Sequence, residues 1–189
     1  MAKTQREISE SAFPRRPALI FATVGNDHRR FVSFERAVEH LARSYPEEHI
    51  LFQHGHSNPL SVAGSRIENH KFLDRATFSQ LITGSDVLFT HAGAGTLLQA
   101  VEASQKPIVM ARRSELSEHI NDHQLDILQE FSRMQLCYPV STPEQAQQAF
   151  EQERSGARKA EATPGATSST SEIFLDQVAS VVSRALQPN

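Results

Sequence analysis

Cysteine and tryptophan are nearly missing from this sequence, which has Cys137 as its single thiol and no tryptophan. One cysteine cannot form an internal disulfide or a cysteine-paired zinc site, so a reducing compartment is expected. No apolar run approaches the roughly 18 residues of a membrane span, and the first residues lack the apolar segment of a signal peptide. The composition therefore predicts a cytoplasmic protein that would need a partner to reach a membrane.

An excess of positive charge is also missing. The 189 residues include 19 Lys and Arg against 22 Asp and Glu, which gives a formal net charge of -3. Such a balance provides no overall attraction to nucleic acid or to anionic lipid. A chain of this length buries one substantial core and is short for two domains of usual size. We therefore expect one domain and no nucleic-acid partner.

Short apolar runs alternate with amphipathic stretches along most of the chain. Strands are predicted at 18–24, 49–53, around Ile67, 87–90, 108–111 and 135–140, and helices at 29–43, 74–82, after Thr96, at 118–133 and from 142. This alternation predicts an α/β fold with a Rossmann-like, doubly wound parallel sheet that binds ligands at the carboxyl ends of its strands.

The two ends of the chain are expected to lie outside this core. Residues 1–17 are predicted to form a flexible N-terminal extension, followed by the Rossmann-like domain at 18–152. Residues 153–171 are rich in Ala, Ser, Thr and Gly, which is typical of a flexible loop. Residues 172–189 contain an amphipathic stretch, which predicts a C-terminal helix that packs on the domain.

The strongest local motif is THAGAGT at residues 90–96, between a predicted strand and a predicted helix. Glycines in such a turn let backbone amides approach an anion at the positive end of a helix, which suits a diphosphate. A turn that only reverses the chain direction would carry the same glycines, so the spacing leaves both interpretations open. The pattern is neither a Walker A loop nor a complete G-x-G-x-x-G motif, which disfavours an ATPase or a dehydrogenase.

A second polar stretch, residues 112–124, follows the next predicted strand and reaches the same edge of the sheet. Loops of this kind hold the ligand residues of α/β folds, although a solvated surface is the alternative. His119 and His123 have the spacing of metal ligands, but Glu118 precedes the first histidine and no third ligand is evident, so no metal site is predicted.

Asp27 and His28 directly follow the first predicted strand. A carboxylate or an imidazole at a strand end can act as a general base on a hydroxyl group. Capping of the next helix is the structural alternative. The sequence contains no G-x-S-x-G turn, which leaves serine hydrolase chemistry without support.

Several segments together resemble a known family. They are 21–25, 51–55, 72–74, 86–96 and 118–124, in this order. The segments resemble the small family-28-type glycosyltransferase catalytic subunits, similar to the dolichol-pathway N-acetylglucosaminyltransferase catalytic subunit and to bacterial capsule and exopolysaccharide subunits. The resemblance covers about residues 18–140.

This resemblance implies a single domain equivalent to the C-terminal half of a GT-B glycosyltransferase. Such a subunit binds a UDP-sugar, needs no metal or other cofactor, and transfers a hexose or hexuronate to a polyprenyl-diphosphate-linked acceptor in capsule or exopolysaccharide synthesis. A membrane-anchored partner subunit would supply the N-terminal half and the lipid-linked saccharide acceptor, and it would recruit the chain to the cytoplasmic face of the membrane.

The resemblance also implies roles for individual residues. The donor diphosphate would lie against the glycine turn, uracil against the backbone of Leu73, and the sugar against Asp122 and Gln124. Arg112 would lie near the phosphates or the sugar. Many relatives have an acid for the ribose where this chain has Gln99, and Glu102, one turn further on, is the expected substitute for that contact. The implied substrate-binding residues are Gly25, Leu73, His91, Gly93, Ala94, Gly95, Thr96, Gln99, Glu102, Arg112, Asn121, Asp122 and Gln124, and the catalytic candidates are Asp27, His28, Glu118 and His119.

Some alternatives stay open at this point. A non-catalytic nucleotide-sugar-binding regulatory subunit would use the same pocket, and the donor sugar is not identified. The arginines at the start of 112–124 favour an acidic sugar. A nucleotide-sugar epimerase would need both halves of the fold in one chain, and 189 residues leave no room for them. The partner is expected to contact the first helix and residues 54–64.

Overall fold

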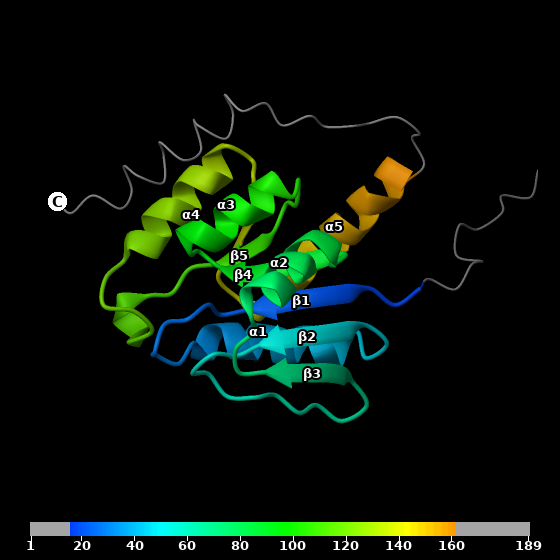
Figure 1. The fold of residues 1–189 in the computed structure, drawn as a ribbon, viewed down its shortest axis with the longest axis horizontal. Coiled ribbons are helices and arrows are strands. Elements are labelled where there is room, and N and C mark those ends of the chain that lie inside the picture. The colour runs from blue at the N-terminus through cyan, green and yellow to red at the C-terminus, as the bar shows by residue number, and fades with distance from the viewer. Residues whose placement is uncertain (1–15, 162–189) are drawn as a thin grey trace, which may run out of the picture.

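The fold is a parallel sheet with helices on both faces (Figure 1). The structure, a computed structural model, describes residues 16–161. Neighbouring strands are parallel and lie in the order β3-β2-β1-β4-β5-β6. The strands are β1 (Leu19–Thr23), β2 (His49–Gln53), β3 (Arg66–His70), β4 (Val87–His91), β5 (Ile108–Met110) and β6 (Tyr138–Val140). The predicted doubly wound α/β fold is therefore confirmed.

The helices divide between the two faces of the sheet. They are α1 (Val32–Ser44), α2 (Arg75–Gly84), α3 (Ala94–Glu102), α4 (His123–Arg133) and α5 (Pro143–Glu161), with a short 3-10 helix η1 (Ser114–Leu116). Phe34 of α1 and Phe150 of α5 belong to one buried cluster. Leu97 of α3 and Phe131 of α4 belong to another on the opposite face, where Ile82 of α2 also packs.

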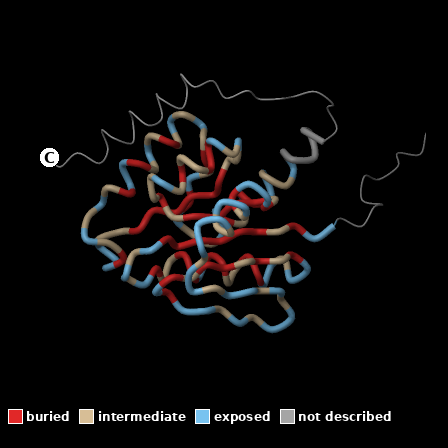
Figure 2. Tube along the Cα trace, in the orientation of Figure 1, coloured by how far each residue is buried: buried red, intermediate tan, exposed pale blue. Residues whose placement is uncertain are grey.

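The strands are apolar on both sides because both faces of the sheet are covered. Along β1, Ile20 belongs to the cluster with α1 and α5, whereas its neighbour Phe21 belongs to the cluster with α2. Phe34 stacks on Phe89 of β4 with ring centroids 4.1 Å apart. Figure 2 shows the buried residues concentrated along the strands and the inner sides of the helices.

The order of the strands places a crevice at the centre of the sheet. From β1 the chain moves outward to β2 and β3, then crosses back and continues from β4 to β6 on the other side. The connections that leave β1 and β4 therefore diverge, and ligands of such folds bind between them, at the carboxyl ends of the strands. These connections contain Asp27 and Gly93, which is the N-cap residue of α3.

Helix α4 begins at His123, five residues later than residue 118, where it was predicted to begin. The preceding loop, residues 111–122, is held by its own side chains. Asp122 accepts hydrogen bonds from the backbone and the hydroxyl of Ser114, and the carbonyl of Glu118 accepts from Arg112. These side-chain partners replace the helical hydrogen bonds that the same backbone groups would otherwise make.

Helix α5 extends to Glu161, so the predicted flexible loop does not begin at residue 153. The Ala, Arg, Lys and Glu content of this segment has high helix propensity, which the prediction underweighted against its single glycine. Residues 162–171 of that loop, the predicted C-terminal helix and residues 1–15 of the N-terminal extension lie outside the described residues. Between residues 16 and 161, every helix is too short or too polar to cross a bilayer.

Candidate functional site

A pocket of about 500 Å³ opens at the central crevice, within the usual size range of ligand sites. Its walls come from the ends of β1, β2 and β4 and from the first turns of α2 and α3. The lining residues are Gly25, Asn26, Gln53, Leu73, Arg75, Phe78, His91, Gly93, Ala94, Gly95, Thr96 and Gln99. The glycine turn, Gly25, Leu73 and Gln99 are thus brought together as predicted, whereas Asn26, Gln53 and Arg75 were missed.

The imidazole of His91 lies beside Gly25 and Gly93 and leaves no room for a side chain at either position. A Cβ atom on Gly93 would lie 2.2 Å from Nε2 of His91, and one on Gly25 would lie 2.5 Å from the same ring. Gly25 also has a φ of +74°, which L side chains rarely adopt. Burial, assisted by the charge of Arg112, lowers the pKa of His91 to about 4. The pocket wall therefore contains a neutral imidazole at physiological pH.

The N-terminus of α3 faces this pocket without a side-chain cap. Gly93 is the N-cap residue, the first turn contains no acidic side chain, and Ala94, Gly95 and Thr96 line the pocket. The first backbone N–H groups of a helix have no intrahelical acceptor and carry partial positive charge. A Cβ atom on Gly95 would meet nothing within 4 Å, so packing within the described protein does not require this glycine. These features suit an anionic group bound close to the backbone.

The opposite end of the pocket is more apolar. Leu73 and Phe78 line it, and Oε1 of Gln99 is buried without a partner among the described residues. Gln53 shapes the floor, since its amide nitrogen donates to the carbonyls of Gly25 (3.2 Å) and Lys71 (3.1 Å). A polar residue that ends a buried strand is the sequence feature that would have revealed Gln53.

Glu102, the predicted substitute for the ribose contact, is exposed at the end of α3 and does not line the pocket. Helix α3 has 9 residues, and one further turn carries the side chain away from the crevice. The structure therefore does not bring Glu102 to the pocket. Arg75 lines the pocket, and its guanidinium has no hydrogen-bond or ion-pair partner among residues 16–161.

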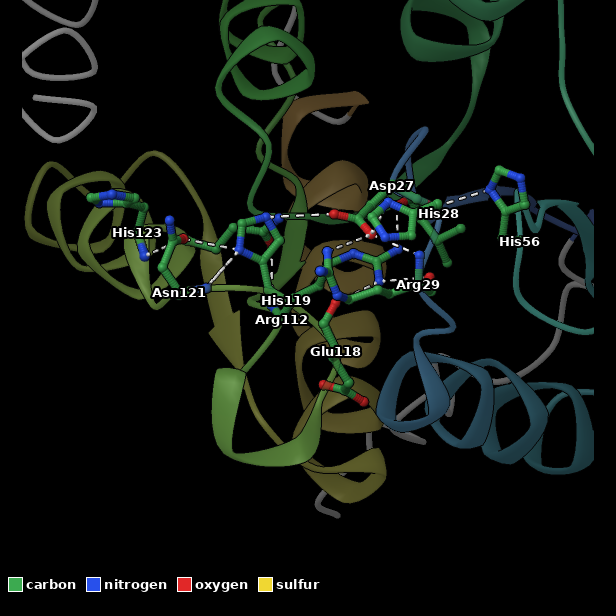
Figure 3. Close-up of polar contacts among 11 residues, drawn as sticks. Asp27, His28, Arg29, His56, Arg112, Glu118, His119, Asn121 and His123 are labelled. Carbon is green, nitrogen blue, oxygen red and sulfur yellow. Dashed lines mark hydrogen bonds and ion pairs between the residues drawn. The ribbon is translucent and has the colours of Figure 1, made fainter. Parts of the chain in front are cut away.

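A second polar cluster lies at the same edge, between the β1–α1 connection and the loop 111–122 (Figure 3). Nε2 of His119 is 3.6 Å from Oδ2 of Asp27. Although burial raises the pKa of Asp27, the hydrogen bond from the Arg29 amide and the charge of Arg112 lower it below its ordinary value. Asp27 is therefore a carboxylate, and it faces the imidazole.

The other ring nitrogen of His119 is held by Asn121. Nδ1 lies 3.0 Å from the backbone carbonyl oxygen of Asn121 and 2.9 Å from its side-chain oxygen. A carbonyl oxygen can only accept, so Nδ1 carries the proton in the neutral ring. Nε2 then has a free lone pair on the side of Asp27. Asn121, which was predicted to bind substrate, thus orients the imidazole.

The remaining catalytic candidates differ in position. The side chain of His28 is 74 % exposed and lies 3.8 Å from Asp27, on the solvent side of the cluster. Glu118 is buried, and its Oε1 accepts hydrogen bonds from the backbone (2.9 Å) and the hydroxyl (2.7 Å) of Ser33. Because Ser33 lies in the first turn of α1, Glu118 caps that helix, and its carboxylate is not brought to the pair of Asp27 and His119 (Figure 3).

Three predicted sugar and phosphate ligands have partners within the protein. Arg112 is fully buried and donates to backbone carbonyls, and the side chain of Gln124 accepts from the Arg112 amide at 3.0 Å. Asp122 is bound by Ser114, and these bonds lower its pKa. None of the three lines the pocket. Arg113 is paired with Glu115 at 3.1 Å, so the arginines of this loop no longer favour an acidic sugar.

A metal centre is not formed by this cluster. Nδ1 of His56 lies 3.2 Å from the carbonyl of Asp27, and His123 is 3.9 Å from Asp126. Within the described part of the chain, no group of three or more His, Cys, Asp or Glu side chains is arranged to hold a metal ion.

A doubly wound parallel sheet with an uncapped, glycine-flanked helix at its central crevice defines a Rossmann-like ligand-binding domain. The chain belongs to the glycosyltransferase family 28 C-terminal domain family, whose sequence profile matches residues 19–178. The resemblance found in the sequence motifs is therefore confirmed. No curated protein matches the chain.

Solved structures with the same fold are distant in sequence. The glycotransferase of kitacinnamycin aligns over 97 % of this chain and 44 % of its own, with a TM-score of 0.60 and 14 % identity. CalG4, the calicheamicin glycosyltransferase, aligns over 92 % of this chain and 39 % of its own, with a TM-score of 0.51 and 15 % identity. This chain thus spans less than half the length of either protein, and the likeness concerns the fold.

Proposed function

We propose that this chain is the catalytic, UDP-sugar-binding subunit of a two-component glycosyltransferase. The single observation that carries the proposal is the pocket at the strand crevice, where a family 28 domain presents the uncapped N-terminus of α3. Gly95 leaves its space open to a ligand, and Arg75 adds a full positive charge to the same pocket. Both features suit the diphosphate of a nucleotide-sugar.

In this proposal the nucleoside lies toward Leu73 and Phe78, where the wall is apolar, and the backbone of Leu73 faces uracil. The unpartnered Oε1 of Gln99 accepts from a ribose hydroxyl, a role that an amide oxygen fills as well as a carboxylate oxygen. The diphosphate lies against the amides of Gly95 and Thr96. The sugar then projects toward the second cluster, where Asp27 and His119 are located.

The transfer step breaks the bond between the anomeric carbon and the diphosphate oxygen, which takes the electron pair. The α3 amides and Arg75 stabilise the charge that develops on the departing UDP. Nε2 of His119 removes the proton from the attacking hydroxyl, and the carboxylate of Asp27 stabilises the imidazolium. The acceptor oxygen forms the new glycosidic bond. Asp122 is bound by Ser114 and the side-chain oxygen of Gln124 by the backbone amide of Arg112, so in this proposal sugar recognition falls to other groups, including the backbone of the loop 111–122.

The second component supplies the missing wall of this site. Within residues 16–161, four large apolar side chains are exposed, and we call them the apolar rim: Phe72 after β3, Leu116 and Ile120 after β5, and Leu125 in the first turn of α4. Ile120 is 70 % exposed and directly follows His119. This apolar rim, and not the expected surface of α1 and residues 54–64, offers apolar area to a partner. We place there the half that brings a lipid-linked saccharide acceptor at the cytoplasmic face of a membrane.

Donor binding tests the first part of this proposal. The purified chain is titrated calorimetrically with UDP and a panel of UDP-hexoses and UDP-hexuronates, with ADP and NAD as controls and EDTA throughout. Binding restricted to UDP ligands is expected. Absence of UDP binding, with the partner present as well as without it, would contradict the donor-site assignment.

Catalysis is distinguished from a regulatory role by transfer assays on the complex with its partner. His119→Gln removes the base, and a rate loss of about 10²- to 10⁴-fold is expected with unchanged UDP affinity. His123→Gln is the matched control, because His123 lies four residues further along the same segment and does not face Asp27. Full transfer by His119→Gln would favour a non-catalytic, nucleotide-sugar-binding subunit.

A further inference from the structure

Arg112 is a charged side chain without any exposed surface, at the end of the short strand β5. Its Nη1 donates to the carbonyls of Arg29 and Glu118, each at 3.1 Å. Its Nη2 donates to the carbonyl of Val24 at 3.0 Å. One guanidinium group therefore connects the β1–α1 connection with the loop 111–122.

The carbonyls that Arg112 binds belong to residues close to Asp27 and His119 in the sequence. Val24 and Arg29 lie on either side of Asp27 in the sequence, and Glu118 directly precedes His119. The backbone on both sides of the carboxylate and next to the imidazole is thus bound to the same group (Figure 3).

Stability alone does not explain this residue. Among the described residues Arg112 has no ion-pair partner within 4.0 Å, its Nε is buried without a hydrogen-bond partner, and burial lowers its pKa. Its packing partner is the ring of Phe31, 4.5 Å from the guanidinium carbon. A buried charge with incomplete partners is costly, and a well-packed apolar residue is often no worse for stability. Its planar donors do what an apolar residue cannot, since they fix several carbonyls at once.

We infer that Arg112 is a positioning residue, which holds Asp27 and His119 in register across the two loops and contacts no substrate itself. This inference rests on the proposed function, in which that pair accepts the proton of the acceptor hydroxyl. Arg112 does not line the donor pocket, so its effect is separable from UDP binding. Other titratable or charged groups of the described residues near this carboxylate are Arg29, His28, His119 and His91.

Two substitutions separate position from charge. Arg112→Lys keeps the charge but cannot reach all three carbonyls, and Arg112→Met removes both charge and donors. With Arg112→Lys we expect kcat to fall on the order of 100-fold, the loss typical of a misplaced catalytic group, while the UDP affinity and the acid limb of the pH profile stay unchanged. With Arg112→Met the part of the acid limb that reports protonation of Asp27 moves to higher pH as well, because Asp27 loses a neighbouring positive charge. Arg113→Lys, on the exposed neighbouring residue, is the matched control.

A double-mutant cycle decides whether Arg112 acts through Asp27. In an Asp27→Asn background, Arg112→Lys should lower kcat by less than about threefold, since residues that act as a unit are not additive. Equal losses in both backgrounds would overturn the inference and leave Arg112 as a purely structural residue.

A measurement on the chain alone keeps this inference distinct from the proposed function. The imidazole NMR signals of His119 should move in Arg112→Lys and stay in place in Arg113→Lys. If the wild-type complex neither binds UDP-sugars nor transfers sugar, the proposed function fails, whereas unmoved His119 signals in Arg112→Lys refute the positioning itself.

Discussion

Substitution of the two glycines that flank Ala94 tests whether a ligand occupies the space at the N-terminus of α3. A methyl group at Gly95 meets no protein atom within 4 Å, whereas one at Gly93 meets the His91 ring at 2.2 Å. Gly95→Ala should therefore leave the fold intact and interfere only with a bound ligand. Gly93→Ala should disturb the protein itself. The two variants differ by two sequence positions and place the same methyl group at the same turn.

The expected magnitudes follow from these contacts. Alanine in place of Gly95, inside α3, raises the free energy of unfolding by up to about 1 kcal/mol through helix propensity. It should weaken UDP binding at least about tenfold, equivalent to about 1.4 kcal/mol, since the methyl group occupies the space next to the amides. Gly93→Ala should lower the free energy of unfolding by roughly 1–3 kcal/mol through overpacking. The backbone of Gly93, with φ at -85°, allows alanine, so the cost is the contact with His91.

The assay pairs urea unfolding with calorimetric titration of UDP. Gly84→Ala is the matched control for Gly95→Ala: Gly84 lies in α2, also has no atom within 4 Å of an added Cβ, and does not line the pocket. The double variant with Gly93→Ala and His91→Ala should have a higher free energy of unfolding than Gly93→Ala alone. If Gly95→Ala bound UDP as tightly as Gly84→Ala, no ligand would approach the α3 amides, and the reasoning that places the diphosphate there would be refuted.

Two further predictions concern pH and the core. The pKa of His91 is about 4 in the folded state, against an ordinary value of 6.5 for the unfolded chain, so the unfolded chain binds more protons between these values. The contribution of His91 to the free energy of unfolding is therefore complete above pH 6.5 and falls by about 3 kcal/mol as the pH drops through 4. The free energies of urea unfolding at pH 7 and pH 4.5 should differ less in His91→Asn than in the wild type. Phe34→Ala should cost about 3–5 kcal/mol, because Phe34 is fully buried and stacks on Phe89 at 4.1 Å. A loss below 1 kcal/mol, measured by denaturant unfolding, would contradict its central place in the core.

The fold was predictable because its information is local. Strand β2 has the predicted bounds, and β4 differs by one residue, since each is a short run of buried β-forming side chains between polar turns. Asp74 caps α2 through the amide of Thr77 at 3.0 Å, as a helix-start pattern predicts. The glycine turn was predictable for the same reason, because it is recognised from consecutive residues between a strand and a helix.

The loop 111–122 was not predictable in this way. Its sequence offers many polar side chains at a ligand-binding edge, and nothing local tells which of them bind the protein and which bind a ligand. Partners far away in the sequence decide this: Val24 accepts from Arg112 at a separation of 88 residues, and Ser33 donates to Glu118 at a separation of 85 residues. A polar residue with such a partner is satisfied before any substrate arrives. In this loop Nε2 of His119, which lies 3.6 Å from Asp27, and the exposed side chain of Ile120 remain available, on the surface where we propose that the missing half of the enzyme binds.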